Sequence, residues 1–157
     1  MSLGAALLWG FVGTVVLTSL MAGAQGLGLS RMNIPFLLGT MFTPSRDRAT
    51  WLGAALHLMN GWIFALVYIA GFEALGLATW WLGAAGGALH AFFLLAVLMP
   101  LMPSIHPRMV SEYYGPTVNR QVQPPGFLGL NYGRGTALAA VVAHLCYGAV
   151  LGGFYAV

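Results

Sequence analysis

The sequence predicts an all-α membrane protein: one bundle of four transmembrane helices, with a short interfacial or re-entrant segment in the first loop. Only 6% of the 157 residues are charged and 59% are hydrophobic, whereas a soluble globular domain carries about 25% charged residues. Four apolar segments lack Asp, Glu, Lys and Arg, and each is long enough to cross about 30 Å of hydrocarbon. The remaining stretches are too short for a separate soluble domain, so residues 1–157 are expected to form a single membrane domain.

The first predicted helix covers residues 3–27. The chain begins without the positive charges of a secretory signal, and Thr14 and Thr18 interrupt the apolar segment, so we expect a permanent membrane helix. The other predicted helices cover residues 50–72, 79–102 and 136–157. In the third of these, Pro100 is expected to end the regular part of the helix early.

The two long loops carry apolar residues of their own. Residues 33–42 are apolar but too short to span, which predicts a short interfacial or re-entrant helix with Pro35 in its first turn. The loop over residues 103–135 is rich in proline and aromatic residues, and we expect it to fold against the bundle, the lipid headgroups or a partner. His106 in this loop is expected to face solvent or headgroups.

The arginines predict the orientation. All six lie in the first and third loops, while the short second loop, residues 73–78, has none. Because cytoplasmic loops carry an excess of positive residues, both long loops are expected in the cytoplasm, and both termini and Glu73 on the other side of the membrane.

Glycines recur four residues apart along the predicted helices, often in line with a histidine. Small residues at this spacing let helix backbones approach closely in lipid. The glycines expected at helix contacts are Gly53, Gly61, Gly83, Gly87, Gly148 and Gly152. Since residues four apart share a helix face, the same rows place His57, His90 and His144 toward other helices rather than toward lipid.

These three histidines are the candidate cofactor ligands. An imidazole inside the membrane is costly and often marks a functional site, and neutral imidazole binds haem iron and other metals. His57 and His144 lie at the most similar predicted depth and are the preferred pair for a b-type haem, with His90 as the third candidate. The alternative is that each histidine only hydrogen-bonds Thr14, Thr18, Asn60 or a backbone carbonyl across helices.

The small number and the positions of the charged residues disfavour several functional classes. The three acids, Asp47, Glu73 and Glu112, are predicted in three separate loops, which leaves no pair of carboxylates for hydrolysis. The few arginines offer no basic scaffold for nucleic acid. Ion-coupled transport usually employs an acidic residue or a lysine inside the membrane, and the predicted spans have neither.

Three motifs together resemble an uncharacterised bacterial family of small four-helix membrane proteins, a domain of unknown function. They are Gly53-x-x-x-His57-x-x-x-Gly61, Met99-Pro100, and His144-Leu-Cys-Tyr-Gly148-x-x-x-Gly152. The resemblance implies four helices in a bacterial inner membrane, and it implies no established activity.

The first functional hypothesis is an accessory, non-catalytic subunit of a larger bacterial membrane complex, with an electron-transfer assembly, respiratory or photosynthetic, as the expected setting. Its partners would be the lipid bilayer and other membrane subunits, and it could hold quinone or bound lipid. The second hypothesis is a membrane protein whose histidines ligate haem b or another metal. A small channel or transporter is the third.

Overall fold

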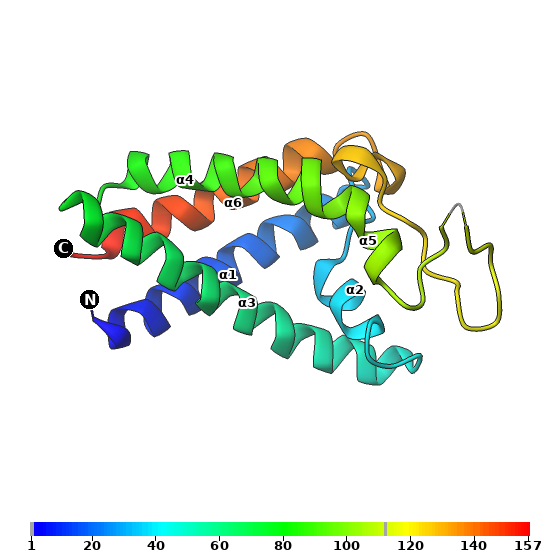
Figure 1. The fold of residues 1–157 in the computed structure, drawn as a ribbon. Helices are drawn as coiled ribbons and strands as arrows, with labels where there is room; N and C mark the ends of the chain where they lie inside the picture. Colours follow the sequence, from blue (N-terminus) through cyan, green and yellow to red (C-terminus); the bar gives the residue numbers. More distant parts are fainter. Residues whose placement is uncertain (1, 112) are drawn as a thin grey trace.

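The computed structural model describes residues 2–111 and 113–157, and the regular elements in these residues are all helical (Figure 1). In chain order they are α1 (Leu3–Gly26), α2 (Ile34–Thr40), α3 (Arg46–Leu75), α4 (Trp80–Phe93), the π-helix η1 (Leu94–Leu98), α5 (Met99–Ile105), the 3-10 helix η2 (Phe127–Tyr132) and α6 (Thr136–Phe154). Helix α1, helix α3, the run from α4 through α5, and helix α6 are each long and apolar enough to cross a membrane. The predicted all-α architecture with four spans is confirmed.

The spanning helices pack in the order α4, α6, α1, α3. Helix α6 packs along α4 on one side and against α1 on the other, and α1 in turn packs against α3. The short helix α2 packs against α3 at the end of the molecule that carries the long loops (Figure 1). Both termini lie at the opposite end (Figure 1).

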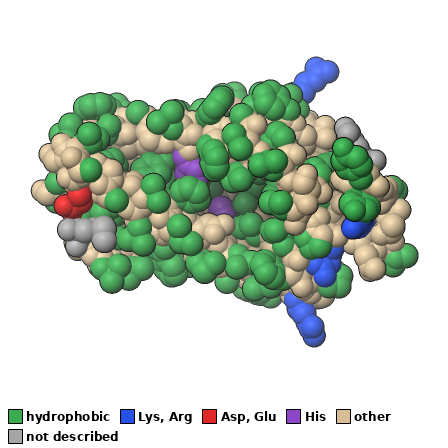
Figure 2. Space-filling model, in the orientation of Figure 1, with side chains coloured by type: hydrophobic (Ala, Val, Ile, Leu, Met, Phe, Trp, Pro, Cys, Tyr) green, Lys and Arg blue, Asp and Glu red, His purple; other side chains and the backbone are tan. Residues whose placement is uncertain are grey.

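The charges separate along the bundle axis. On the face drawn in Figure 2, basic side chains lie at the end that carries the long loops, and acidic atoms lie at the end with the termini. Glu73, predicted in the short second loop, belongs instead to the last turn of α3, where it accepts a hydrogen bond from the Tyr155 hydroxyl. Both arginine-bearing loops therefore share one end of the molecule, which we call the arginine end.

Helix α3 is longer than predicted at both ends. It begins at Arg46 because the Ser45 side chain caps the first turn and Asp47 lies there, near the positive end of the helix dipole. It continues to Leu75 and stops at Gly76, which adopts a left-handed conformation (φ 61°). Its 30 residues are about 45 Å long at the helical rise, so its charged first turn can stand outside a hydrocarbon layer of about 30 Å.

The regular α-helical part ahead of Pro100 ends early, at Phe93, but the chain does not leave the helical path. The α-helical hydrogen bonding changes to a π-helix at Leu94–Leu98, and the chain then continues as α5 to Ile105 with Pro100 in its first turn. The wider π turn accommodates the proline ring and its missing amide donor, so the helix passes through the proline instead of stopping. The last helix, α6, ends at Phe154, three residues before the predicted bound.

Backbone contacts between glycines hold α4 against α6. A Cβ atom added to Gly83 would collide with the carbonyl oxygen of Gly148, and one added to Gly148 would collide with that of Gly83. Gly87 approaches the His144 carbonyl in the same way, and Gly152 approaches Thr79. Only residues without a side chain allow this approach, and it places His90 and His144 on facing helices at the same level.

Helix α2 forms in the segment where a short helix was predicted. Asn33 caps its N-terminus by accepting a hydrogen bond from the Phe36 amide, and Pro35 lies in its first turn. It lies directly on the backbone of α3, because a Cβ on Gly39 would collide with the Ala49 carbonyl and one on Gly53 with the Pro35 carbonyl. Gly53 therefore contacts this short helix and not another spanning helix, whereas Gly61 faces the Thr14 side chain on α1.

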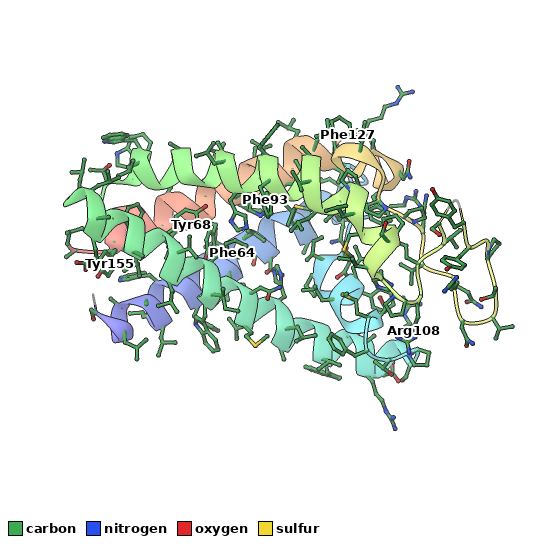
Figure 3. All side chains as sticks on the ribbon, viewed as in Figure 1. Phe64, Tyr68, Phe93, Arg108, Phe127 and Tyr155 are labelled. Atoms are coloured by element: carbon green, nitrogen blue, oxygen red, sulfur yellow. The ribbon has the colours of Figure 1, made fainter. Side chains whose placement is uncertain are left out.

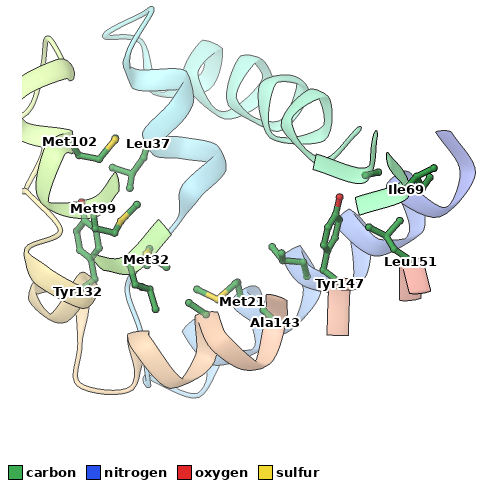
Figure 4. Packing of buried hydrophobic residues seen from close by; sticks show 14 of the residues in the cluster. Met21, Met32, Leu37, Ile69, Met99, Met102, Tyr132, Ala143, Tyr147 and Leu151 are labelled. Atoms are coloured by element: carbon green, nitrogen blue, oxygen red, sulfur yellow. The ribbon is translucent and has the colours of Figure 1, made fainter. Parts of the chain in front are cut away.

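The buried core runs the length of the molecule. Near the arginine end it is made largely of methionine and aromatic side chains, among them Met32, Met99, Met102 and Tyr132 (Figure 4). Toward the termini it consists of Tyr147, Ile69 and Leu151 on α6 and α3 (Figure 4). Methionine adapts to irregular spaces, which suits the junction of α2, η1, α5 and η2.

The expectation that His106 faces solvent or headgroups is wrong. Its side chain is 3% exposed. Its Nδ1 accepts a hydrogen bond from the Arg108 amide at 3.1 Å, so the ring proton is on Nε2, which lies 3.1 Å from the Leu37 carbonyl oxygen and 3.2 Å from the Thr40 hydroxyl. The Arg108 guanidinium donates to the carbonyls of Thr40 and Met41. Together His106 and Arg108 satisfy the last carbonyls of α2, which a helix C-terminus would otherwise leave without donors.

This contact predicts a loss of stability in acid. Burial lowers the pKa of His106 below its ordinary value, although the hydrogen bond to Leu37 raises it, and Arg108 adds a smaller lowering. The unfolded chain therefore takes up a proton at this position near pH 6.5 while the folded chain resists it, so stability is complete above that pH and falls as the pH drops below it.

The measurement is the midpoint of thermal unfolding between pH 5 and pH 8. We expect the midpoint to fall with decreasing pH and to fall less steeply in His106→Gln, which cannot titrate. Equal slopes in the two proteins would show that His106 makes no contribution to the pH dependence.

Candidate functional site

Three histidines from three helices meet in the middle of the bundle. The rings of His90 on α4 and His144 on α6 lie edge to face, with centroids 4.7 Å apart. His57 on α3 lines the same cavity as His144. Figure 2 shows histidine side chains at the bottom of the hollow in the centre of the visible face. The structure thus brings the three predicted residues together inside the bundle.

The tautomer of His144 follows from its hydrogen bond. Its Nδ1 lies 2.7 Å from the carbonyl oxygen of Ala140, one turn earlier on α6. A carbonyl oxygen can only accept, so Nδ1 carries the proton, and in the neutral ring Nε2 keeps a free lone pair. The side chain is 6% exposed. His144 therefore presents a fixed acceptor, or a metal-ligating atom, inside the protein.

Three buried side-chain atoms have no hydrogen-bond partner in the part of the chain that the structure describes: His57 Nε2, His90 Nδ1 and the Tyr68 hydroxyl. All three belong to this central region. The Tyr68 ring contacts both His90 and Tyr147, with centroids 6.2 Å and 5.6 Å apart. Buried polar groups are almost always satisfied, so a cluster of exceptions marks a candidate position for a ligand, an ion or water.

Hydrogen bonding across helices explains none of the three histidines in the part of the chain that the structure describes. Thr14 and Thr18 donate to carbonyls of their own helix, at Gly10 and Thr14, and no described hydrogen bond joins either hydroxyl to a histidine. Of the partners expected from the sequence, only a backbone carbonyl is used, by His144 and within its own helix. Among the described residues, therefore, none of these three histidines hydrogen-bonds another helix.

Aromatic rings that sequence reasoning missed surround the histidines. Phe64 packs against the His90 ring at 3.9 Å, and Phe64 and Tyr68 both project from α3 toward α4 (Figure 3). Tyr147 donates from its hydroxyl to the Gly61 carbonyl at 2.6 Å, which ties α6 to α3. The signal was present in the spacing, because Phe64 and Tyr68 are one turn apart and Tyr147 follows His144 by three residues.

A cavity of about 230 Å³ opens beside His57 and His144, between α1, α2, α3 and α6. Its remaining lining residues are Leu17, Thr18, Met21, Ala22, Gln25, Met32, Asn33, Ile34, Pro35, Phe36, Thr50, Ala54, Leu94 and Ala140. None of these carries a charge, and most are apolar. The cavity is therefore a neutral, mainly apolar space with imidazoles in its wall.

Buried apolar side chains lie between the histidines and the end with the termini. Ala65, Ile69 and Leu151 are completely buried, and Phe72 is nearly so. None of these four residues lines the cavity beside His57 and His144.

The hypotheses of haem binding and of metal binding can be compared with the ring distances and the cavity volume. Two imidazoles on opposite sides of a metal, each about 2 Å from it, would hold their ring centroids roughly 6 Å apart, whereas those of His90 and His144 are 4.7 Å apart. His57 and His144 share a cavity smaller than the roughly 300 to 1,000 Å³ of most cofactor sites. Among the described residues, no group of three or more His, Cys, Asp or Glu side chains is placed to hold a metal.

The acidic residues do not form a second site in the described part of the chain. Asp47 begins α3 at the arginine end, and Glu73 lies in the last turn of the same helix. Glu112, predicted in the third loop, lies outside the described residues.

No protein-family model, no curated protein and no solved structure matches this chain. Its function is therefore inferred from the contacts of its own side chains.

Proposed function

We propose that this protein is an accessory, non-catalytic subunit of a larger complex in a bacterial inner membrane. Its arginine end would lie in the cytoplasm, and both termini on the other side. The positive-inside bias of the six arginines supports this orientation. The observation that supports the subunit role is a loop at the arginine end whose apolar side chains are exposed.

This projecting loop comprises the described residues 111 and 113–120. Its base is held by the pairing of Met109 with Val122: the Val110 amide donates to the Val122 carbonyl, and the Val122 amide donates to the Arg108 carbonyl. Met109 is completely buried and anchors the base in the core. In Figure 1 the loop extends away from the helices, beyond α2 and α5.

The tip of the projecting loop exposes large apolar residues. Tyr113 is 90% exposed and Val118 is 89% exposed. The arginines of this end would lie at the level of the headgroups, and a loop that extends past them would enter water. Exposed apolar side chains are unfavourable there. Aromatic side chains at such positions are typical of protein interfaces, which favours a protein partner that covers the tip.

An electron-transfer assembly, respiratory or photosynthetic, is the setting that we propose. The support is the cluster of three imidazoles inside the membrane, two of which have a buried ring nitrogen without a partner in the described residues, since polar groups inside a membrane often mark a functional site. The chain offers few groups for catalysis of its own, because its two described acids lie at opposite ends of α3. An accessory subunit of a redox complex is consistent with both the buried imidazoles and the small number of catalytic groups.

The test is the size of the complex that contains the protein after extraction from its own membrane in a mild detergent. We expect the wild-type chain to migrate in a large assembly at native expression levels. The double variant Tyr113→Ser/Val118→Ser should weaken that association at least tenfold, because aromatic anchors at interfaces commonly contribute 2 kcal/mol or more.

The matched control is Val157→Ser, which removes an exposed aliphatic side chain at the opposite end of the molecule. It should leave the assembly intact. A wild-type protein that migrates alone, or a double variant that stays in the assembly as well as the control does, would contradict the proposal.

A further inference from the structure

We propose that the cavity beside His57 and His144 binds a neutral, lipid-soluble ring that carries carbonyl or hydroxyl oxygens, as quinones and hydroquinones do. This inference adds a ligand site to the proposed subunit role. It rests on the cavity alone and makes no use of the projecting loop, so the two proposals can fail separately.

The walls of the cavity select a neutral and mainly apolar ligand. Met21, Met32 and Leu94 supply apolar surface from α1, from the segment before α2 and from η1. No lining residue bears a formal charge that could pair with a phosphate, a carboxylate or an ammonium group. Burying a charged group there without a partner would be costly, which excludes most lipid headgroups and polar metabolites.

The two imidazoles supply complementary hydrogen-bonding atoms. His144 Nε2 is a fixed acceptor because Nδ1–H is held by the Ala140 carbonyl. The His57 ring lines the same cavity and makes no hydrogen bond among the described residues, so it can donate to one ligand atom or accept from it. A hydroquinone matches both rings, because one of its hydroxyls can donate to His144 and the oxygen of the other can accept from His57. The oxidised quinone offers only carbonyl oxygens, which can accept from His57.

A second hollow adjoins the cavity and opens on the lipid-facing surface. It is lined by Phe11, Val15 and Leu58 on the outer side, and it shares Thr18, Pro35, Ala54 and His57 with the cavity. It lies between α1 and α3, on the surface that lipid covers in a membrane. A ligand dissolved in the bilayer can therefore reach the histidines from the side, and an apolar tail can remain in this hollow.

The size of the cavity agrees with a single ring. About 230 Å³ is less than most sites for whole drug-sized ligands, but here only the head of the ligand has to be enclosed. Tyr147, three residues after His144, is buried and donates to the Gly61 carbonyl on α3, so the ring would stop at the histidines.

The experiment measures saturable binding of a decyl-tailed benzoquinone to the purified full-length protein in lipid nanodiscs, above its partition into empty nanodiscs. We expect saturable, equimolar binding. Ala54→Phe should weaken it at least tenfold, because Ala54 lines both the cavity and the hollow, and its exposed position lets the variant fold. His57→Leu should also weaken it about tenfold, through loss of the hydrogen bond.

Leu138→Phe is the matched control, since it adds a similar ring on an exposed position of α6 away from the cavity. It should bind the probe as the wild type does. Binding that Ala54→Phe and Leu138→Phe affect equally would overturn the assignment of the site. Competition by decanol as strong as that by unlabelled benzoquinone would overturn the ligand class, and the absence of a saturable component would overturn both.

Discussion

Gly83→Ala is expected to lower the free energy of unfolding by about 3 kcal/mol, the upper part of the range for overpacked sites. The added methyl group would collide with the carbonyl oxygen of Gly148, which belongs to the backbone of α6 and cannot rotate away. The two helices must separate, and their contacts along the whole seam then weaken. Unfolding in mixed detergent and SDS micelles, followed by circular dichroism, measures the change.

Gly71→Ala is the matched control, because a Cβ atom there meets nothing within 4 Å. It should be neutral or slightly stabilising, since alanine favours helices over glycine by up to about 1 kcal/mol. Gly148→Ala disturbs the same contact as Gly83→Ala, so the double variant should lose less than the sum of the two. A Gly83→Ala protein as stable as Gly71→Ala would show that α4 and α6 do not touch here.

His106→Leu is expected to lower the free energy of unfolding by about 2 kcal/mol and to loosen α2. The substitution removes the acceptor of the Arg108 amide and a donor to the Leu37 carbonyl. Both backbone groups then lose this hydrogen-bond partner in a buried position, which is costly. Because α2 forms one wall of the histidine cavity, its loosening should also speed amide hydrogen exchange in Leu37 and Thr40.

Two further variants isolate the cause. His106→Gln keeps a donor near the Leu37 carbonyl and should recover part of the stability. Ile105→Ala removes apolar surface from an exposed neighbour on α5 and should leave the exchange of α2 unchanged. If His106→Leu and Ile105→Ala change α2 equally, the contacts of His106 do not hold it.

The spans could be predicted because charges are almost absent from lipid-facing helices, and four uncharged stretches are readable without a structure. Their ends could not, because they depend on local contacts. Ser45 caps α3 so that the helix begins at Arg46, four residues before the predicted bound at residue 50, and a π-helix lets the chain pass Pro100. A hydropathy profile detects neither the serine cap nor the π-helix.

The inward position of the histidines was predictable from their spacing to glycine. That His57 and His90 each have a ring nitrogen without a partner among the described residues, by contrast, depends on where the facing hydroxyls point, and Thr14 and Thr18 donate within their own helix. The burial of His106 depends on α2, which folds back from a region 66 residues earlier to meet it. Contacts between segments so far apart in the chain leave no periodic signal in one sequence.

Electron cryo-microscopy of the assembly extracted from its own membrane tests the central claim most directly. We expect a neighbouring protein against Tyr113 and Val118, and the rings of His57, His90 and His144 enclosed between the spanning helices. A particle that contains only this chain, with the projecting loop in solvent, or a map in which the imidazoles face the surrounding lipid, would contradict the account.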